Sequence, residues 1–214
     1  MKSRVLVCML MVSLFVLVPT AWAGTYNESP MLRERVEQGL LPPVEERLPE
    51  NPYVVEPVES IGKYGGTIRL LTMYADRPLG VAFVGDSYNG FVNPLPDGSG
   101  VVPHFVEAIE ESEDKTTYTF HLRRGVRWSD GHPFTADDVM FWYEDYLNNS
   151  ELVPAIPSYW QSGGEVVKVS KIDDYTVVFS FKEPQPLFLR MPLSKAPMRD
   201  RFFLPKHYMK DFHP

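Results

Sequence analysis

Histidines and carboxylates are the side chains of this sequence that could perform catalysis or bind a metal ion. The histidines are His104, His121, His132, His207 and His213. None of them pair at metal-ligand spacing, and no H-E-x-x-H motif occurs. The neighbouring Asp137 and Asp138 fall in the first turn of a predicted helix, where carboxylates compensate the helix dipole. We therefore expect no metal ligands and no catalytic carboxylates among them.

Other catalytic signatures are also missing from the sequence. It contains no G-x-S-x-G nucleophile motif and no phosphate-binding loop. A secreted hydrolase would need a nucleophile, a base and an orienting group, and no such set is found. We expect no enzyme activity and no cofactor.

Three aromatic side chains are candidates for contacting a bound solute. Tyr74 is at the end of a predicted strand, and Tyr159 and Trp160 are in a predicted loop that Pro154 and Pro157 interrupt. Aromatic faces at such positions can line a cleft for a peptide or a sugar. The alternative, that these rings anchor loops to the core, stays open.

The elements that would position such residues are clearest between Tyr118 and Tyr143. Apolar residues alternate with polar ones from Tyr118 to Leu122, which is the period of a half-buried strand. Ser129-Asp130-Gly131 predicts a turn, because Asp can accept from the backbone ahead of it and Gly accepts a positive φ.

A helix is predicted to follow this turn. Thr135 is the expected N-cap, and Asp138 is its partner in a shortened capping box. One face of the helix is apolar and consists of Ala136, Val139, Met140, Tyr143 and Leu147.

This block closely resembles the signature region of the bacterial solute-binding protein family 5, the oligopeptide-, dipeptide- and nickel-binding proteins of ABC importers. The signature residues are Tyr118, Phe120, Leu122, Arg123, Gly125, Trp128, Asp130, Gly131, Thr135, Asp138 and Val139. The resemblance continues through residues 166–182 and 204–208, and it covers the sequence from about Gly65 onward. It implies that the signature is a scaffold corner rather than the ligand site.

The resemblance also implies a fold class, which is α/β (mixed α+β) and periplasmic-binding-protein-like. Two lobes close around the solute by hinge motion, and an extra domain is added. The expected segments are a Pro-rich arm at 24–62, the start of lobe one at 63–93, the added domain at 94–174 and the return into lobe one at 175–214. Because members of the family are more than twice as long, we expect an incomplete C-terminus and a fragment that binds solute poorly on its own.

The first 23 residues predict a secretory signal peptide. Lys2 and Arg4 precede the apolar run Val5–Val18, and Ala21-Trp22-Ala23 is an A-x-A cleavage site before Gly24. The alternative is an uncleaved anchor, but this run is shorter than the roughly 18–20 residues that span a bilayer. We expect a periplasmic or extracellular product.

Further elements are predicted from local patterns. Residues 31–38 are expected to form a helix capped by Ser29, and residues 101–109 a short helical or irregular segment. Strands are predicted at 67–74, 166–170 and 175–182, and helices at 184–191 and 205–212.

The expected function is the solute-binding component of an ABC importer, with an oligopeptide as solute and a membrane permease as partner. An oligosaccharide-binding member of the same family, or a secreted interaction module without a role in transport, is the alternative. Removal of Lys2 and Arg4 changes the formal net charge from −7 to −9, which argues against nucleic-acid binding. We expect a monomer.

Overall fold

The computed structural model describes residues 26–67, 90–95, 97–190 and 203–212. The predicted signal peptide, most of the predicted strand at 67–74 and the candidate residue Tyr74 lie outside these ranges. In the described ranges, no helix combines the length and the apolar character needed to cross a bilayer. The chain divides into two compact units, residues 1–45 and 46–214.

The first unit contains the predicted capped helix, α1 (Pro30–Glu37). Pro30 occupies the first turn, and Gly39 follows the helix with a φ of 69°. Ser29 caps the helix only through its backbone carbonyl, which accepts from Leu32 and Arg33 at 2.9 and 3.1 Å. The predicted helix and its N-cap at Ser29 are therefore confirmed, although the Ser29 side chain makes no capping hydrogen bond. The short helix α2 (Val44–Arg47) crosses the boundary between the units.

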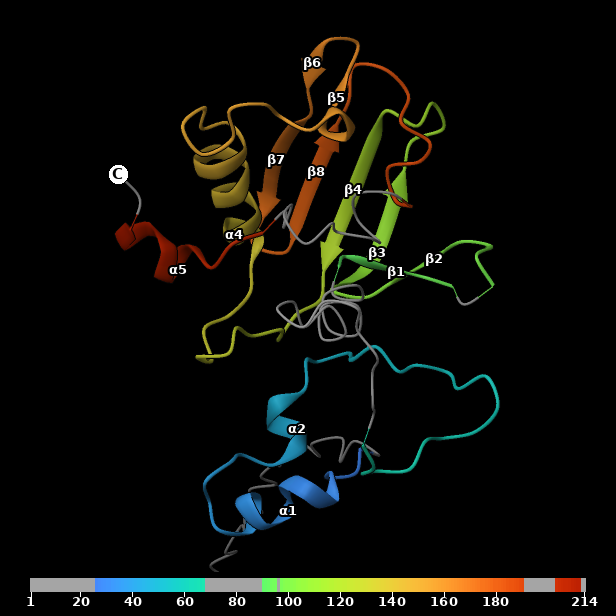
Figure 1. Ribbon diagram of the computed structural model, residues 1–214, viewed down its shortest axis with the longest axis vertical. Helices are drawn as coiled ribbons and strands as arrows, with labels where there is room; N and C mark the ends of the chain where they lie inside the picture. Colours follow the sequence, from blue (N-terminus) through green and yellow to red (C-terminus); the bar gives the residue numbers. More distant parts are fainter. Residues whose placement is uncertain (1–25, 68–89, 96, 191–202, 213–214) are drawn as a thin grey trace, which may run out of the picture. The chain divides into compact units, whose positions relative to one another are not determined.

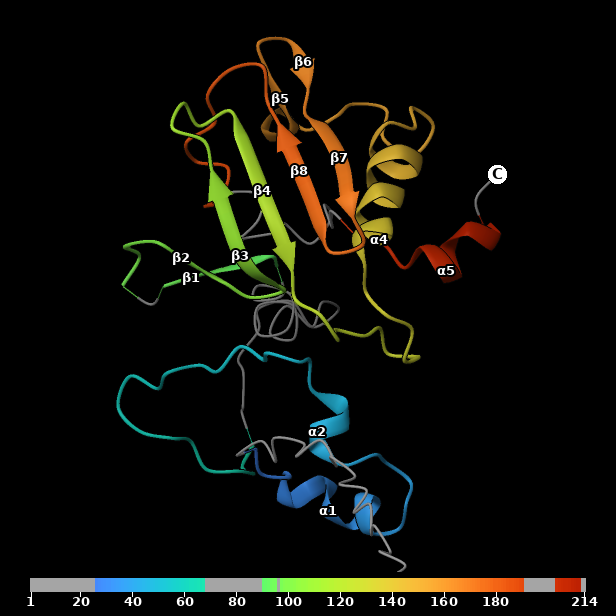
Figure 2. The ribbon, with the colours of Figure 1, turned by 180° about the vertical axis from the view of Figure 1, so that it is seen from behind.

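The second unit is built on a four-stranded antiparallel sheet. Its strands are β3 (Val106–Glu111), β4 (Thr117–Leu122), β7 (Lys168–Asp173) and β8 (Thr176–Ser180), in the spatial order β3-β4-β8-β7. Figures 1 and 2 show the four strands side by side, with helix α4 next to β7. The predicted strand in the signature is β4, and Phe120 in it is paired with Ile109 on one side and Val177 on the other.

The prediction of a helical or irregular segment at 101–109 is wrong. This region forms β2 (Val101–Pro103), which pairs with β1 (Val92–Pro94), and the start of β3. Strand β3 is at the edge of the sheet, and its three glutamates, Glu107, Glu110 and Glu111, are all exposed, so its apolar alternation is weak. A register shift between Val106 and Ala108 interrupts the alternation further.

Helix α4 (Ala136–Phe141) continues without a break into the π-helix η1 (Trp142–Leu147). Of the predicted apolar face, Ala136, Val139 and Leu147 are buried, and Met140 and Tyr143 pack partly buried against the core. Phe141 and Trp142 are buried as well, which the 3.6-residue period did not predict. The wider π turns change which residues face the core after Phe141.

Smaller elements complete the second unit. They are the 3-10 helix η2 (Ser158–Trp160), the strand pair β5 (Gln161–Ser162) and β6 (Glu165–Val166), helix α5 (Lys206–Met209) and the 3-10 helix η3 (Lys210–Phe212). The last two confirm the helix predicted at 205–212.

The helix predicted at 184–191 is wrong as far as the structure describes it. Residues 186–190 form turns closed by short-range backbone hydrogen bonds, in which the Phe188 N–H donates to the Gln185 carbonyl at 2.9 Å and the Arg190 N–H donates to the Leu187 carbonyl at 3.0 Å. The Gln185 N–H donates to the Lys115 carbonyl at 2.8 Å, and the Gln185 carbonyl accepts from the Tyr118 hydroxyl at 2.7 Å.

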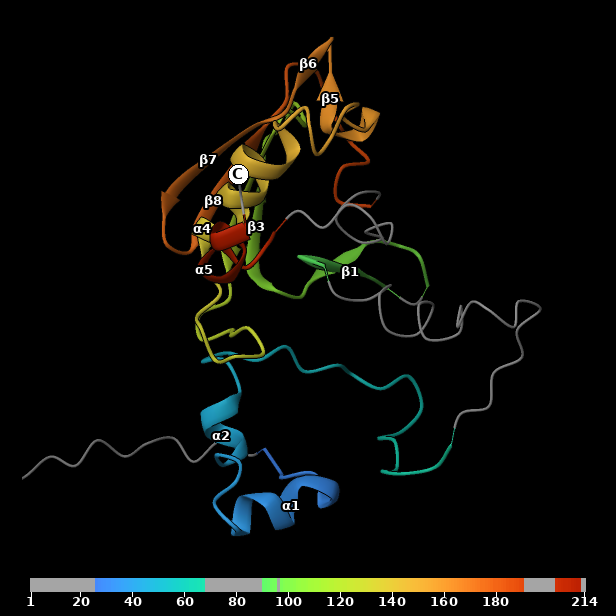
Figure 3. The same cartoon turned by 60° about the vertical axis from the view of Figure 1, so that its left-hand side comes forward.

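The core lies between the sheet and α4, with η2 and the 186–190 turns closing one end. Figure 3 shows α4 from the side, with α5 near the first turn of α4. Tyr118, Phe120 and Leu122 point into this core from β4 and are almost completely buried. The Phe188 ring contacts the rings of Tyr118 and Phe181, with centroids 5.0 and 4.8 Å apart. The signature strand thus supplies the centre of the core.

The sheet extends across one predicted domain boundary. Strands β7 and β8 pair through a tight turn at Asp174 and Tyr175, so residues on both sides of position 174 belong to one sheet. The division into an added domain at 94–174 and a return at 175–214 stays a prediction.

The signature residue Arg123 and its neighbour Arg124 hold the Pro-rich arm. Arg123 is buried, and its guanidinium donates to the carbonyls of His104 and Val106 at 3.0 Å each and to the Asn51 carbonyl of the arm. The Glu50 N–H donates to the Arg124 carbonyl at 3.1 Å. Burial lowers the pKa of Arg123 from its usual value. The guanidinium nevertheless keeps its positive charge.

Beyond this contact the arm is less anchored than its apolar residues predict. Val44, Leu48 and Tyr53 are half-buried, but Val54 and Val55 are 67% and 68% exposed. The Tyr53 ring contacts the His104 ring edge-on at a centroid distance of 5.7 Å.

Gly125 allows the arm to approach closely, and this can be tested. Its φ is 83°, and a Cβ there would lie 3.1 Å from both the Pro49 Cα and the Glu50 nitrogen. We expect Gly125→Ala to lower the free energy of unfolding by about 2–4 kcal/mol, combining left-handed strain with overpacking. The measurement is urea unfolding followed by tryptophan fluorescence.

Gly131→Ala is the matched control, because Gly131 has a φ of 89° and no atom within 4 Å of a built Cβ. It should cost only the strain, about 1–2 kcal/mol. Equal losses in the two variants would show that contact with the arm contributes nothing.

Candidate functional site: the signature corner

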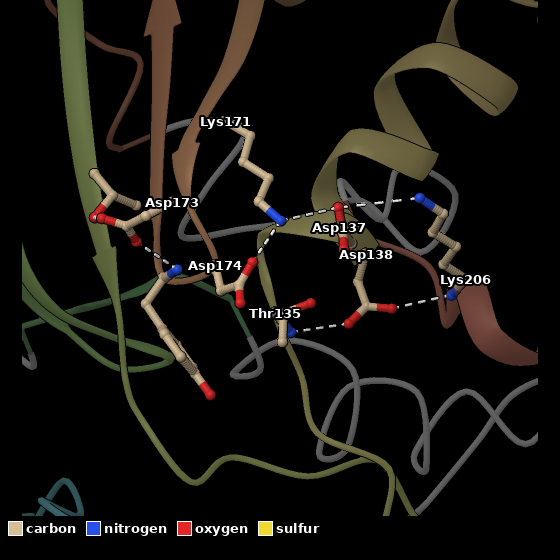
Figure 4. Close-up of polar contacts among 9 residues, drawn as sticks. Thr135, Asp137, Asp138, Lys171, Asp173, Asp174 and Lys206 are labelled. Atoms are coloured by element: carbon tan, nitrogen blue, oxygen red, sulfur yellow. Dashed lines mark hydrogen bonds and ion pairs between the residues drawn. The ribbon is translucent and has the colours of Figure 1, made fainter.

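The carboxylate of Asp138 joins three separate parts of the second unit, and Figure 4 shows two of these contacts. One oxygen, Oδ2, accepts from the Thr135 N–H at 3.0 Å, as in the predicted capping box, and from the Trp128 Nε1–H at 3.1 Å. The other, Oδ1, accepts from the Lys206 N–H at 3.0 Å. The Asp138 carbonyl also accepts from the Leu204 N–H at 3.1 Å.

Asp138 is only 2% exposed, so these hydrogen bonds replace its hydration. The residue therefore fastens the turn, the start of α4 and the C-terminal segment together. We call the residues at this junction, Trp128, Asp130, Gly131, Thr135, Asp138, Lys206 and His207, the signature corner.

Charged side chains surround this junction on the solvent side (Figure 4). The Lys171 ammonium lies 2.6 Å from Asp174 and 3.2 Å from Asp137. The hydrogen bond with Asp174, followed by that with Asp137, raises the pKa of Lys171 above its usual value. The Lys206 ammonium is 4.0 Å from Asp137. These exposed pairs link β7, α4 and α5, and each contributes little by itself.

The predicted turn has the predicted geometry. The His132 N–H donates to Asp130 Oδ1 at 3.0 Å, and the Gly131 N–H donates to the Trp128 carbonyl at 2.9 Å. The second carboxylate oxygen of Asp130 lies 2.6 Å from His207 Nε2, on α5. The hydrogen bond from His207 is the main cause that holds the pKa of Asp130 below its usual value.

An apolar pocket opens beside the corner. It encloses about 280 Å³ of empty space, part of it open to solvent. Its lining consists of Phe105, Val126, Arg127, Trp128, Phe134 and Phe203. The Phe203 ring contacts Phe134 edge-on at 5.2 Å and Phe105 edge-on at 5.7 Å. The aromatic surface there is fixed by contacts among the rings themselves.

The described solute candidates lie away from this pocket. Trp160 is 1% exposed, and its ring stacks on Phe179 at 6.1 Å and contacts Trp142 at 4.8 Å. Tyr159 is partly buried against the same core, and its hydroxyl oxygen is buried with no hydrogen-bond partner among the described residues. Both rings lie where the loop-anchoring alternative would place them. Tyr74 is outside the described residues.

The histidines that the structure describes do not gather into a metal site. Across the described ranges, no group of three or more His, Cys, Asp or Glu side chains is placed to hold an ion. His104 Nδ1 lies 3.2 Å from the Gly90 carbonyl, and burial lowers the pKa of His104. His121 is paired with Glu110 on the sheet at 2.8 Å.

Sequence reasoning missed the partners of the signature turn on the C-terminal segment. Lys206 and His207 are 68 and 77 positions from Asp138 and Asp130, so no local pattern connects them. The available signal was that residues 204–208 and the signature both match one family pattern.

Comparison with known proteins decides the family. The model of the middle region of the bacterial extracellular solute-binding proteins, family 5, matches residues 100–208, which is half of the chain. The chain belongs to this family. Its members are solute-binding proteins and not enzymes, which confirms the expectation of a non-enzymatic function.

Relatives with different solutes match this chain. A periplasmic alpha-galactoside-binding protein of Rhizobium meliloti (strain 1021) is 33% identical over 213 residues, covering 88% of this chain and 30% of that protein. A dipeptide-binding protein of Escherichia coli (strain K12) is 35% identical over 120 residues, covering 48% of this chain and 22% of that protein.

Two solved structures resemble most of the chain. An oligopeptide-binding protein OppA is 41% identical with a TM-score of 0.74, over 89% of this chain and 29% of that one. The periplasmic binding protein MelB of Agrobacterium fabrum C58, in complex with stachyose, is 28% identical with a TM-score of 0.60, over 89% of this chain and 31% of that one. The mixed α/β fold is thus confirmed for this part, and the chain spans about 30% of these relatives' length.

The role of Asp138 gives a direct prediction. Asp138→Ala leaves three N–H donors, on Thr135, Trp128 and Lys206, without their acceptor. Because each unpaired buried donor costs about 1–3 kcal/mol, we expect the free energy of unfolding to fall by at least about 3 kcal/mol. Urea unfolding of the purified chain measures this.

Asp137→Ala is the control at the neighbouring position. The Asp137 side chain is 49% exposed, and within the described part of the chain its polar contacts are the ion pairs with Lys171 and Lys206. Its removal should cost less than about 1 kcal/mol. Comparable losses at both positions would contradict the role assigned to Asp138.

Proposed function

We propose that this chain is part of an extracytoplasmic solute-binding protein that delivers its solute to an ABC importer in the membrane. The family match over residues 100–208 carries this proposal. The predicted signal peptide at residues 1–23 agrees with it, since such a protein works outside the cytoplasm. The permease of the importer is the proposed protein partner.

The proposed solute is an oligosaccharide with α-galactosyl units. The relative that binds alpha-galactosides matches this chain over 88% of its length, including residues before the family block. One of the two solved relatives reported above that cover 89% of the chain holds stachyose, itself such an oligosaccharide. The E. coli dipeptide-binding protein matches only 48% of the chain.

An oligopeptide, which the sequence analysis favoured, is the second candidate. It is supported by the 41% identity and the TM-score of 0.74 with the oligopeptide-binding protein OppA. The two candidates require different sites, because a sugar presents hydroxyl groups and a flat apolar face, whereas a peptide presents backbone N–H and C=O groups.

The signature corner is proposed to be a scaffold rather than the solute site. The carboxylate of Asp138 is fully used by hydrogen bonds within the chain and is buried. Tyr74, Tyr159 and Trp160 remain candidates for contact with solute, and the buried position of Trp160 makes it the weakest of the three.

Titration calorimetry on the mature protein purified from its host tests the choice of solute. We expect stachyose and raffinose to bind with a Kd at or below about 10 μM, equivalent to about −7 kcal/mol, and tri- and tetrapeptides to give no heat of binding. Sucrose, which lacks the α-galactosyl unit, is the control ligand. Peptide binding without sugar binding would reject the oligosaccharide and favour the second candidate.

A separate prediction concerns the same titration carried out on the 214-residue chain. Solute in this fold class is enclosed between two lobes, and this chain spans about 30% of the length of the alpha-galactoside-binding relative and of OppA. We therefore expect it to bind every ligand more weakly than about 10 μM. Tighter binding would mean that this chain contains the whole site.

A further inference from the structure

Two histidine rings stack at the signature corner, one from the turn and one from α5. The rings of His132 and His207 are parallel to within 5°, with their centroids 3.8 Å apart. His207 Nε2 lies 2.6 Å from Asp130, and His132 Nδ1 lies 3.0 Å from the Pro133 carbonyl. These contacts, together with the amides of Leu204 and Lys206 on Asp138, attach the C-terminal segment to the corner.

This stack tolerates one positive charge better than two. Two imidazolium rings at this distance repel each other, and the single carboxylate of Asp130 can neutralise only one of them. A second proton on His207 would also create an N–H donor at Nδ1, which is buried and has no hydrogen-bond partner in the described part of the chain. Burying such a donor without an acceptor is unfavourable.

The neighbouring charges do not remove this effect. They are Arg127 beside the turn, Asp137 and Asp138 on α4, Lys206 on α5, and Lys210 and Asp211 on η3. Asp138 is occupied by N–H donors, and Asp137 is paired with lysines. The net charge at the stack is therefore set by the carboxylate of Asp130 and the two imidazole rings.

We propose that the stacked pair His132 and His207 is an acid-sensitive contact. It holds residues 203–209 at the signature corner and releases them when both rings are protonated. Histidine side chains titrate between about pH 5 and 8, a range that an extracytoplasmic protein meets directly. The pKa of Asp130 is lowered, mainly by the hydrogen bond from His207, so its carboxylate stays ionised at pH values below its usual range and the change in charge comes from the rings. The proposal holds for either solute.

Amide hydrogen exchange on the full chain between pH 7.5 and 5.5 tests it. The probes are the N–H groups of Leu204 and Lys206, which donate to Asp138, with rates corrected for intrinsic exchange. We expect their protection factors to fall at least tenfold on acidification, while amides between β4 and β8 keep theirs as an internal reference for folding. Constant protection of Leu204 and Lys206 would overturn the proposal.

Variants assign the effect to the stack. His132→Phe keeps an aromatic ring against His207 but cannot take a proton, and His132→Gln serves if that variant does not fold. Either should reduce the change in protection to less than twofold. His121→Phe, on the sheet and away from the stack, where His121 is paired with Glu110, should behave as the unmodified chain. A tenfold fall that persists without His132 would overturn the proposal.

Discussion

The buried carboxylate of Asp138 is the interaction on which the arrangement of this chain depends. A carboxylate leaves water at a considerable cost unless hydrogen bonds replace its hydration, and here two backbone amides and an indole N–H do so. The three donors come from the start of α4, from the first residue of α5 and from the turn after β4. One side chain thereby fixes the relative positions of elements that are distant in the sequence.

The same signature acts on the other side through Arg123 and Gly125. The guanidinium binds three backbone carbonyls, one of them in the Pro-rich arm, and Gly125 leaves room for Pro49 and Glu50. Signature residues therefore contact the arm, the turn and the C-terminal segment. The proposed scaffold role accounts for the signature residues forming one continuous stretch of sequence. A solute site would instead combine residues from separated segments.

The sequence predicts the local parts of this structure and misses the parts set by distant contacts. The strand through Phe120, the turn at Gly131 and the capping box at Asp138 follow from periodicity, φ preference and side-chain chemistry over a few residues. Strand β3 was missed because it is an edge strand with charged outward residues, and the turns at 186–190 because Gln185, just before them, bonds to Lys115 and Tyr118, which are distant in the sequence. The contacts of Lys206 and His207 could not be predicted, since only the tertiary fold brings them to the signature.

A double-mutant cycle between Trp128 and Asp138 tests the central claim most directly. Trp128→Phe removes the indole donor and keeps an aromatic ring, and Asp138→Ala removes the acceptor. If the carboxylate joins the turn to the helix, the free energies of unfolding of the two single variants and the double variant should give a coupling energy of at least about 1 kcal/mol. Additivity within about 0.3 kcal/mol would contradict it.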